Sequence, residues 1–201
     1  MLGISPERVR QLVVDGRLPG LRFGNSWAVP RSEVLARRNR GVWGGRPLGP
    51  LEAWRQLLAA QVNLEEPGRY GSRSRIERCQ VSAADLDYLL HSHPVMEGGV
   101  PAAIDYGALL FDADSRDIYL SESLRQQIDS EMAIVMDPLG PVRLHIVNDD
   151  AWALLSNAQA ALRQGRSCIA PKSAVALDLV ESPEARIREA AEKLMQRGNR
   201  G

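Results

Sequence analysis

The stretch LGISPERVRQLVVDGRLPGLRFGNSWAVPRSEV, residues 2–34, carries a helix signal, a turn signal and a hairpin signal in immediate succession. Ser5 and Pro6 form a helix start, because a Ser side chain caps free backbone N–H groups and Pro at the first helical position costs no hydrogen bond. Apolar residues then recur at helical spacing, at Val9, Leu12 and Val13. The stretch therefore predicts a short helix with one apolar face.

A β-hairpin is predicted directly after this helix. Two short apolar runs flank the turn residues Gly24 and Asn25, and Trp27 is expected in the core of the hairpin. The segment that begins at Pro30 then starts another helix, with arginines clustered at Arg31, Arg37, Arg38 and Arg40. Residues 1–40 thus predict a helix, a hairpin and a helix.

With this spacing of helix, Gly-Arg-Leu-Pro turn, hairpin Trp and closing helix, residues 2–38 resemble the helix-turn-helix of excisionase and MerR-type winged-helix proteins. The resemblance implies a winged helix-turn-helix DNA-binding domain over residues 1–40. Its second helix would enter the major groove and its wing would touch the DNA backbone or minor groove. A first helix should brace the second, yet only Met1–Gly3 precedes the turn. We expect either a start further upstream or a replacement brace from residues 50–62.

The polar residues of the helix and hairpin divide into two expected roles on DNA. Arg and Gln make paired hydrogen bonds to guanine and adenine, so Arg10 and Gln11 are the expected base readers. Phosphate contacts supply salt-dependent affinity rather than sequence choice. The residues expected to contact the phosphate backbone are Ser5, Arg8, Arg17, Arg22, Asn25 and Ser26. The alternative for Arg8 and Arg10 is an ordinary solvated helix face.

The net charge of zero hides an asymmetry between the two halves of the chain. Residues 1–80 hold 14 Arg against 7 acidic residues, a net charge of +7, whereas residues 81–201 hold 11 basic and 18 acidic residues, a net charge of −7. A basic half suits a polyanion such as DNA, and an acidic half suits a different partner. The charge distribution therefore favours a division of labour.

The middle of the chain predicts a linker followed by helices. Gly and Pro dominate residues 41–49, and residues 50–94 predict a mostly helical segment. Pro50 opens a helix with Trp54 in its apolar stripe, another helix is expected from about Ser72, and a third follows the capping residue Ser82. The second of these would carry Arg73, Arg75 and Arg78, either as a further nucleic-acid contact or as a polar face.

Residues 95–201 predict a mixed α/β domain. The run from Ala108 to Asp129 indicates strand, turn, strand and helix, and VRLHIV alternates as a strand does. Asp149 and Asp150 are expected to cap a helix, and the apolar run of residues 167–182 indicates strands. A final helix is expected from Ser182, with Ile187, Ala190, Ala191 and Leu194 as its apolar stripe. The complete chain is therefore expected in the α+β class.

No catalytic, metal or cofactor motif stands out. The sequence has no Gly-rich phosphate loop and no nucleophile elbow, and the two cysteines, Cys79 and Cys168, lie far apart. His91 and His93 form an HxH pair without an evident third ligand, so surface or capping roles are expected. We therefore expect neither enzyme activity nor a bound cofactor or metal. Without a leader or a long apolar run, we expect a cytoplasmic protein with no membrane partner.

The C-terminal half is similar to that of AbiEi-type antitoxins of type IV toxin–antitoxin systems. The similarity lies in the strand order and in the closing VALDLVESPEARIREAAEKL, and it covers residues 95–197. It implies a DNA-binding antitoxin that represses its own operon and counters a nucleotidyltransferase toxin. The implied partners are double-stranded operator DNA and that cognate toxin. One alternative is an excisionase-like architectural factor, which a neighbouring integrase gene would favour. The other is a MerR-like regulator, which a long coiled coil would favour.

Overall fold

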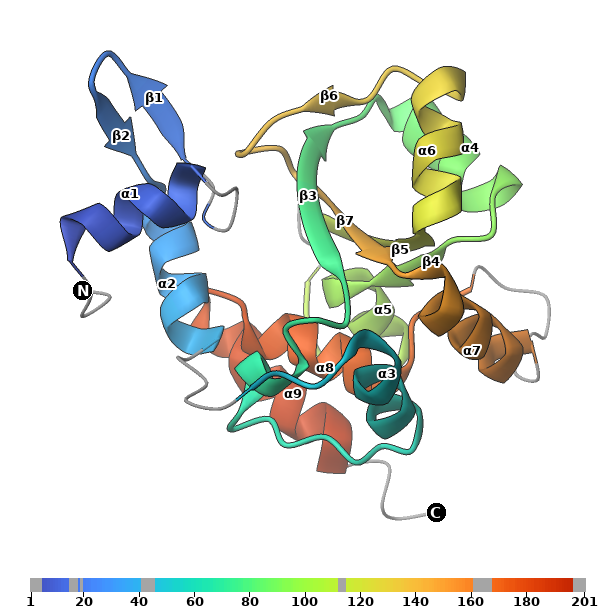
Figure 1. Ribbon diagram of the computed structural model, residues 1–201. Coiled ribbons are helices and arrows are strands. Elements are labelled where there is room, and N and C mark those ends of the chain that lie inside the picture. Colours follow the sequence, from blue (N-terminus) through green and yellow to red (C-terminus); the bar gives the residue numbers. More distant parts are fainter. Residues whose placement is uncertain are drawn as a thin grey trace.

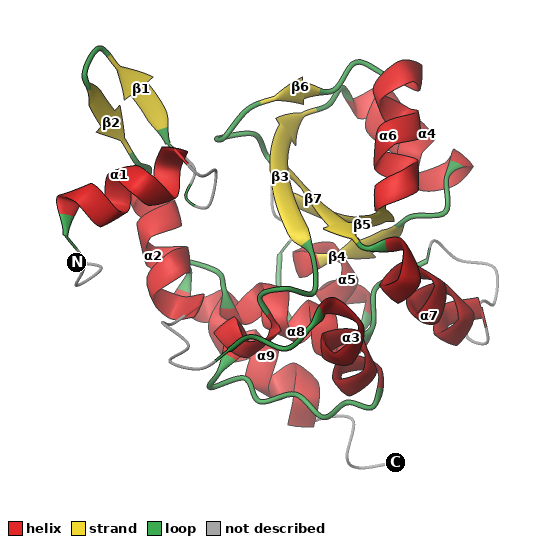
Figure 2. Ribbon diagram, viewed as in Figure 1, coloured by secondary structure: helices red, strands yellow, loops and turns green. Residues whose placement is uncertain are grey.

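The computed structural model describes residues 5–14, 18, 20–40, 46–111, 115–160 and 168–196. These residues form a small N-terminal module, up to residue 40, and a larger body, from residue 46 onward (Figure 1). The body contains a five-stranded sheet between helices, and the module contains a two-stranded sheet (Figure 2). The predicted α+β class is confirmed. Within the described ranges, each helix is too short or too polar to traverse a lipid bilayer.

The N-terminal module has the predicted order of helix, hairpin and helix. Its elements are α1 (Pro6–Val14), β1 (Leu21–Phe23), β2 (Ser26–Ala28) and α2 (Arg31–Arg40). Its apolar cluster is small: Leu12, Val13 and Leu18 are buried, and Val9, Trp27 and Val29 pack against them. The apolar face predicted for the first helix is therefore confirmed, and so is the core position of Trp27.

The sheet of the body follows the order β4-β5-β7-β3-β6. Its strands are β3 (Arg75–Gln80), β4 (Met96–Gly98), β5 (Arg116–Ser121), β6 (Val135–Met136) and β7 (Val142–Val147). The central strands β5 and β7 pair parallel, and the other neighbours pair antiparallel. The predicted strand VRLHIV is confirmed as β7.

Helices cover both faces of this sheet. Alternate side chains of β7 point to opposite faces, and those on one face are all apolar, whereas those on the other face are partly polar and partly apolar. Val142, Leu144 and Ile146 face α4 (Ala83–Ser92) and α6 (Glu122–Glu131). The opposite face lies against the rest of the helical structure: α3 (Pro50–Leu58), the 3₁₀ turn Pro67–Tyr70, α5 (Gly99–Asp105), α7 (Asp149–Ala160), α8 (Lys172–Val180) and α9 (Ala185–Gln196). The body is thus a three-layer α–β–α arrangement.

Several predicted helix signals are confirmed in the body. Pro50 stands at the start of α3, and Trp54 is fully buried with its indole N–H donating to the Arg73 carbonyl at 2.8 Å. Ser82 caps α4, since its hydroxyl accepts from the Asp85 N–H at 3.0 Å. The apolar stripe predicted for the last helix is buried in α9. That helix begins at Ala185, three residues after Ser182.

The expected helix from Ser72 is wrong, because residues 75–80 form strand β3. Cys79 lies opposite Val142 of β7 and Met136 of β6, so β3 is paired on both of its edges. Pairing of this kind decides the conformation of a segment that has no helical apolar stripe of its own. The segment 50–94 therefore shares one sheet with strands from residues 96–147.

Three further expectations are corrected. The apolar run AVALDLV is a helix, α8, buried from Ser173 to Leu179; an unbroken apolar run is equally compatible with a buried helix and a buried strand. Residues 108–111 form no strand, and Leu109 is 90% exposed. The cap of α7 is Asn148 rather than Asp149 or Asp150. The Asn148 Oδ1 accepts hydrogen bonds from the N–H groups of Asp150 and Ala151, whereas the Asp149 carboxylate accepts from the Ser123 hydroxyl.

Candidate nucleic-acid interface

The start of α1 is fixed by a side-chain cap. Ser5 Oγ accepts a hydrogen bond from the Arg8 N–H at 3.2 Å, and the Ser5 carbonyl accepts from the Val9 N–H at 3.1 Å. The cap satisfies a backbone donor that the first turn of a helix leaves without a partner. Ser5 therefore has a structural role, and its exposed position also lies at the helix end that attracts anions.

The polar residues of α1 lie opposite its apolar face. Arg8, Arg10 and Gln11 are exposed, whereas Leu12 and Val13 are buried. The structure therefore brings both predicted base readers to one solvent-facing side of a helix. Arg17, predicted as a phosphate contact, lies outside the described residues.

The hairpin presents a second group of predicted contacts. Gly24 has φ +56° at the first of the two turn positions, a conformation that glycine adopts without strain and that suits a tight hairpin. Arg22 folds back on this turn, with its Nε–H donating to the Gly24 carbonyl at 3.0 Å. Asn25 and Ser26 are exposed at the tip. The predicted hairpin contacts thus all lie at the solvent-facing end of the module.

The apolar face of α1 packs on its own module. Leu12 and Val13 contact the cluster that includes Leu18 and Trp27, and the Leu18 N–H donates to the Leu12 carbonyl at 3.0 Å. Residues 50–62 do not supply the expected replacement brace. Their buried residues belong instead to the body, where Trp54 and Leu57 share a core with α7 and α8.

An ion pair joins the module to the sheet of the body. Glu33 of α2 pairs with Arg78 of β3, and both side chains are more than four-fifths buried. The Arg78 guanidinium also donates to the Gly140 carbonyl at 3.2 Å. Arg78 therefore holds α2 against the sheet, and it is not an exposed contact for nucleic acid.

The three arginines predicted on a common helix have three different environments. Arg73 is buried and pairs with Asp178 and Glu181, at 3.1 and 3.3 Å. Arg75 is exposed and pairs with Glu77. Of the two functions weighed for this group, a shared nucleic-acid surface is excluded, because Arg73 and Arg78 are largely buried in ion pairs with Asp178, Glu181 and Glu33.

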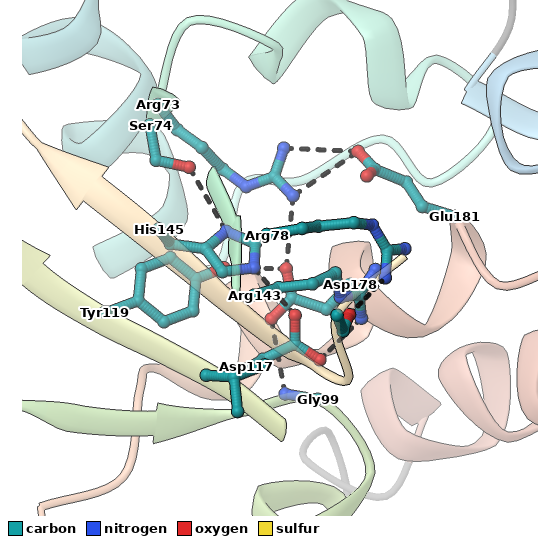
Figure 3. A network of polar contacts seen from close by, with 12 residues as sticks. Arg73, Ser74, Arg78, Gly99, Asp117, Tyr119, Arg143, His145, Asp178 and Glu181 are labelled. Atoms are coloured by element: carbon teal, nitrogen blue, oxygen red, sulfur yellow. Dashed lines mark hydrogen bonds and ion pairs between the residues drawn. The ribbon is translucent and has the colours of Figure 1, made fainter. Parts of the chain in front are cut away.

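Arg73 belongs to a buried polar network that sequence reasoning missed (Figure 3). Asp117 of β5 pairs with Arg143 and His145 of β7, which lie directly across from it and two residues along. The Tyr119 hydroxyl donates to Asp178 of α8 at 2.7 Å, and its ring stacks on His145 with 4.3 Å between centroids. The network thus ties the central parallel strands to the helix that covers them.

The two aspartates of this network differ in their electrostatics, because burial outweighs the neighbouring cations at Asp178 and raises the pKa of its carboxyl, whereas the pKa of Asp117 is lowered. Burial disfavours the ionised form of the Asp117 carboxyl, but the Arg143 guanidinium and His145 outweigh it and hold its pKa well below the usual range. Burial raises the pKa of the Tyr119 hydroxyl, and the neighbouring Asp178 carboxylate adds to that shift. Tyr119 is therefore a neutral hydrogen-bond donor at physiological pH.

Asp117, His145 and Asp178 bring carboxylate and imidazole atoms within 4.8 Å of one another, close enough to resemble a metal site. Those atoms already have partners: Asp178 accepts from Arg73, Tyr119 and the Gly99 N–H, and both ring nitrogens of His145 are engaged. A cation would have to displace these donors beside two guanidinium groups. The chemistry of the set therefore favours a closed network of ion pairs.

The HxH histidines separate: His91 has the expected surface position, whereas the side chain of His93, at the C-terminal cap position of α4, is only 8% exposed. His91 is exposed on α4 and contacts Asp87 one turn earlier. The ring of His93 lies against Tyr88 and within 3.1 Å of a Glu131 oxygen. The two rings thus have different partners on different elements.

Phe23 is a surface residue that sequence reasoning assigned only to an apolar run. It is 63% exposed on β1, opposite Ser26 and beside the hairpin turn. The register could have indicated this position, since Arg22 and Trp27 lie across from each other and Trp27 faces α1. Phe23 then points to the other, solvent-facing side. It adds an apolar group to the exposed end of the module.

Comparison with known proteins adds no relative. No family model, no curated protein and no solved structure matches this chain.

Proposed function

We propose that the protein is a DNA-binding antitoxin and transcriptional autorepressor of a type IV, AbiE-like toxin–antitoxin operon. In this function the N-terminal module is a winged helix-turn-helix that binds operator DNA. The body engages the cognate nucleotidyltransferase toxin, and the chain itself catalyses no reaction.

The observation that carries the DNA-binding part is the exposed polar side of α1 beside the exposed hairpin tip. Arg8, Arg10 and Gln11 lie on the helix, and Arg22, Asn25 and Ser26 lie on the hairpin. Arginine and glutamine suit base edges in the major groove, and the hairpin residues suit phosphate and sugar. Phe23 would contact the sugar edges or the floor of the minor groove, where apolar side chains are used.

The body supports the antitoxin part by its charge and by its construction. The ionised side chains of the central network pair with one another inside the body. Most of the acidic residues in 81–201 therefore lie at the surface. The closing sequence that resembles AbiEi antitoxins forms α8 and α9, with Asp178 as the buried anchor of Arg73. A MerR-like regulator is less favoured, since no helix within the described ranges exceeds twelve residues.

Co-expression tests this function directly. The chain is produced together with the nucleotidyltransferase encoded beside its gene, and growth of the host is scored with and without it. We expect the chain to restore growth and to repress a reporter fused to its own promoter. Failure of both readouts contradicts the proposal, whereas repression without rescue would favour a regulator unrelated to a toxin.

The matched control separates the two activities. The double variant Arg10→Ala/Arg22→Ala changes only exposed side chains of the module. We expect it to lose repression while it still restores growth when expressed from an independent promoter. Loss of rescue in this variant would show that the module also takes part in neutralisation.

A further inference from the structure

Val14 is an exposed apolar residue at the end of α1. Its side chain is 60% exposed, whereas Leu12 and Val13, directly before it, are buried. The described apolar cluster of the module forms around Leu12, Val13 and Leu18 and does not include Val14. Val14 therefore lies outside the core of the module, and its apolar surface is available to a partner.

The position of Val14 on the helix places it among the predicted base readers. An α-helix turns by about 100° per residue, so Val14 lies about 40° from Arg10 and about 60° from Gln11, between the two around the helix axis. All three residues are exposed. Figure 1 shows α1 beside the β1–β2 hairpin and remote from helices α3 and α7 of the body. This side of α1 is therefore accessible to a ligand as large as a DNA duplex.

The remaining exposed residues of α1 leave the surroundings of Val14 free of a carboxylate. Glu7 lies in the same sector of the helix, but it precedes Val14 by about two helical turns. Arg8 lies beyond Gln11. The side of α1 that is opposite its apolar face thus has valine and glutamine in the middle and an arginine on each flank.

Thymine is the base whose major-groove edge matches an apolar side chain. The edges of adenine, guanine and cytosine present hydrogen-bonding groups, whereas thymine adds a C5 methyl group. A valine that covered polar edges would leave donors or acceptors without partners, which costs free energy. A valine that covers the methyl group removes apolar surface on both sides from water.

We propose that Val14 is a specificity-determining residue that contacts the C5 methyl group of a thymine in the major groove of the operator. The inference rests on the proposed function and names one base that this function selects. Gln11 and Val14 are separated by about 4.5 Å along the helix axis, and consecutive base pairs are about 3.4 Å apart. The thymine is therefore expected in a base pair next to the one that Gln11 contacts.

Replacement of thymine by uracil tests the inference, because it removes the methyl group and leaves base pairing unchanged. The operator is first located by footprinting on the DNA upstream of the chain's own gene. Duplexes are then made in which each thymine of the footprint in turn is replaced by uracil. Binding of the full-length chain to each duplex is measured by fluorescence anisotropy.

Three variants of the full-length chain complete the test. Val14→Ala truncates the apolar side chain, and α1 should persist because alanine is the best helix former. Val14→Ile keeps an apolar side chain at the same position. The matched control is Leu109→Ala, which truncates a side chain of the body that is 90% exposed. Thermal unfolding of each variant shows that it is folded.

We expect a thymine position at which uracil weakens binding of the unchanged chain about fourfold, the effect of withdrawing one methyl group from a buried contact. Val14→Ala should bind the thymine duplex about fourfold more weakly, and it should bind the uracil and thymine duplexes of that position equally. Val14→Ile and Leu109→Ala should keep the preference for thymine.

Three results would overturn the inference while operator binding stands. Uracil has no effect at any position, or Val14→Ala keeps the full preference for thymine, so that another residue reads the methyl group. In the third, Val14→Ala weakens binding equally on every duplex, which places Val14 at a contact with another protein chain. Absence of operator binding by the unchanged chain at low salt contradicts the proposed function as well.

Discussion

The arginines of the module and those of the body are the same residue in opposite environments. In the module, Arg8, Arg10 and Arg22 are exposed on a helix and a hairpin that share a small apolar cluster. In the body, Arg73 is 2% exposed and pairs with two carboxylates, that of Asp178 in α8 and that of Glu181 directly after α8. The first group is available to a polyanion, and the second is held by internal carboxylates.

Net charge therefore does not identify a nucleic-acid surface by itself. Residues 1–80 carry a net charge of +7. Arg73 and Arg78 contribute to that total, although both are held in ion pairs within the protein. Only charges that remain exposed release counterions from DNA. The exposed basic surface of residues 1–80 is therefore smaller than the sequence suggests, and α1 and the hairpin contribute Arg8, Arg10 and Arg22 to it.

Among the variants that separate buried from exposed arginines, Arg73→Met should lose the most stability. The variant leaves Asp178 and Glu181 buried without their cation, which costs about 3–5 kcal/mol of unfolding free energy. Urea unfolding measures that loss. Arg10→Ala is the control and should change stability by less than about 0.5 kcal/mol. Equal stabilities for the two variants would break the distinction between buried and exposed arginines.

The acid limb of stability should also report the buried network. The pKa of Asp117 is lowered in the folded state, so the unfolded chain takes up its proton first as the pH falls. Stability is therefore full above the unfolded value of about 3.9 and is lost as the pH falls below it. Urea unfolding at stepwise lower pH should show a steep decline. A flat profile down to about pH 3 would contradict the matched charges of the network.

In the module, Arg10→Ala should alter DNA binding and leave the fold intact. Loss of a paired contact to a base edge costs about 1–3 kcal/mol and relaxes sequence choice at one base pair. Selection of binding sites from a random DNA library measures that choice. An unchanged site preference would remove Arg10 from the base-reading residues.

The smallest expected change comes from Arg22→Ala. Loss of one phosphate contact should weaken binding equally for all sequences and reduce the log–log salt slope by about one unit. Titrations at several salt concentrations measure the slope. If Arg22→Ala instead changes which sequences are bound, Arg22 is a base reader and its assignment to the phosphate backbone is wrong.

The fold of the module was predictable because its signals are local. Ser5 directly precedes α1 and caps it, and Gly24 forms the turn between the two adjacent apolar runs of the hairpin. Such signals depend on neighbours only a few residues away. The same holds for Ser82 at the start of α4.

The buried network and strand β3 were not predictable, because they depend on distant partners. Arg73 meets Asp178 across 105 residues of sequence, and Asp117 meets His145 across 28. A signal was nevertheless present in α8, where Asp178 interrupts an apolar run. Such a charged residue among apolar ones is rarely buried without a partner. The sequence does not indicate which partner, since that depends on the order of the strands.

We propose that α1 and the hairpin bind DNA through exposed basic side chains, and the salt dependence of promoter binding by the full chain tests this most directly. With ~6 phosphate contacts, the logarithm of the association constant should fall with the logarithm of salt concentration at a slope near ~−5. A slope near zero, or no binding at low salt, would contradict the account.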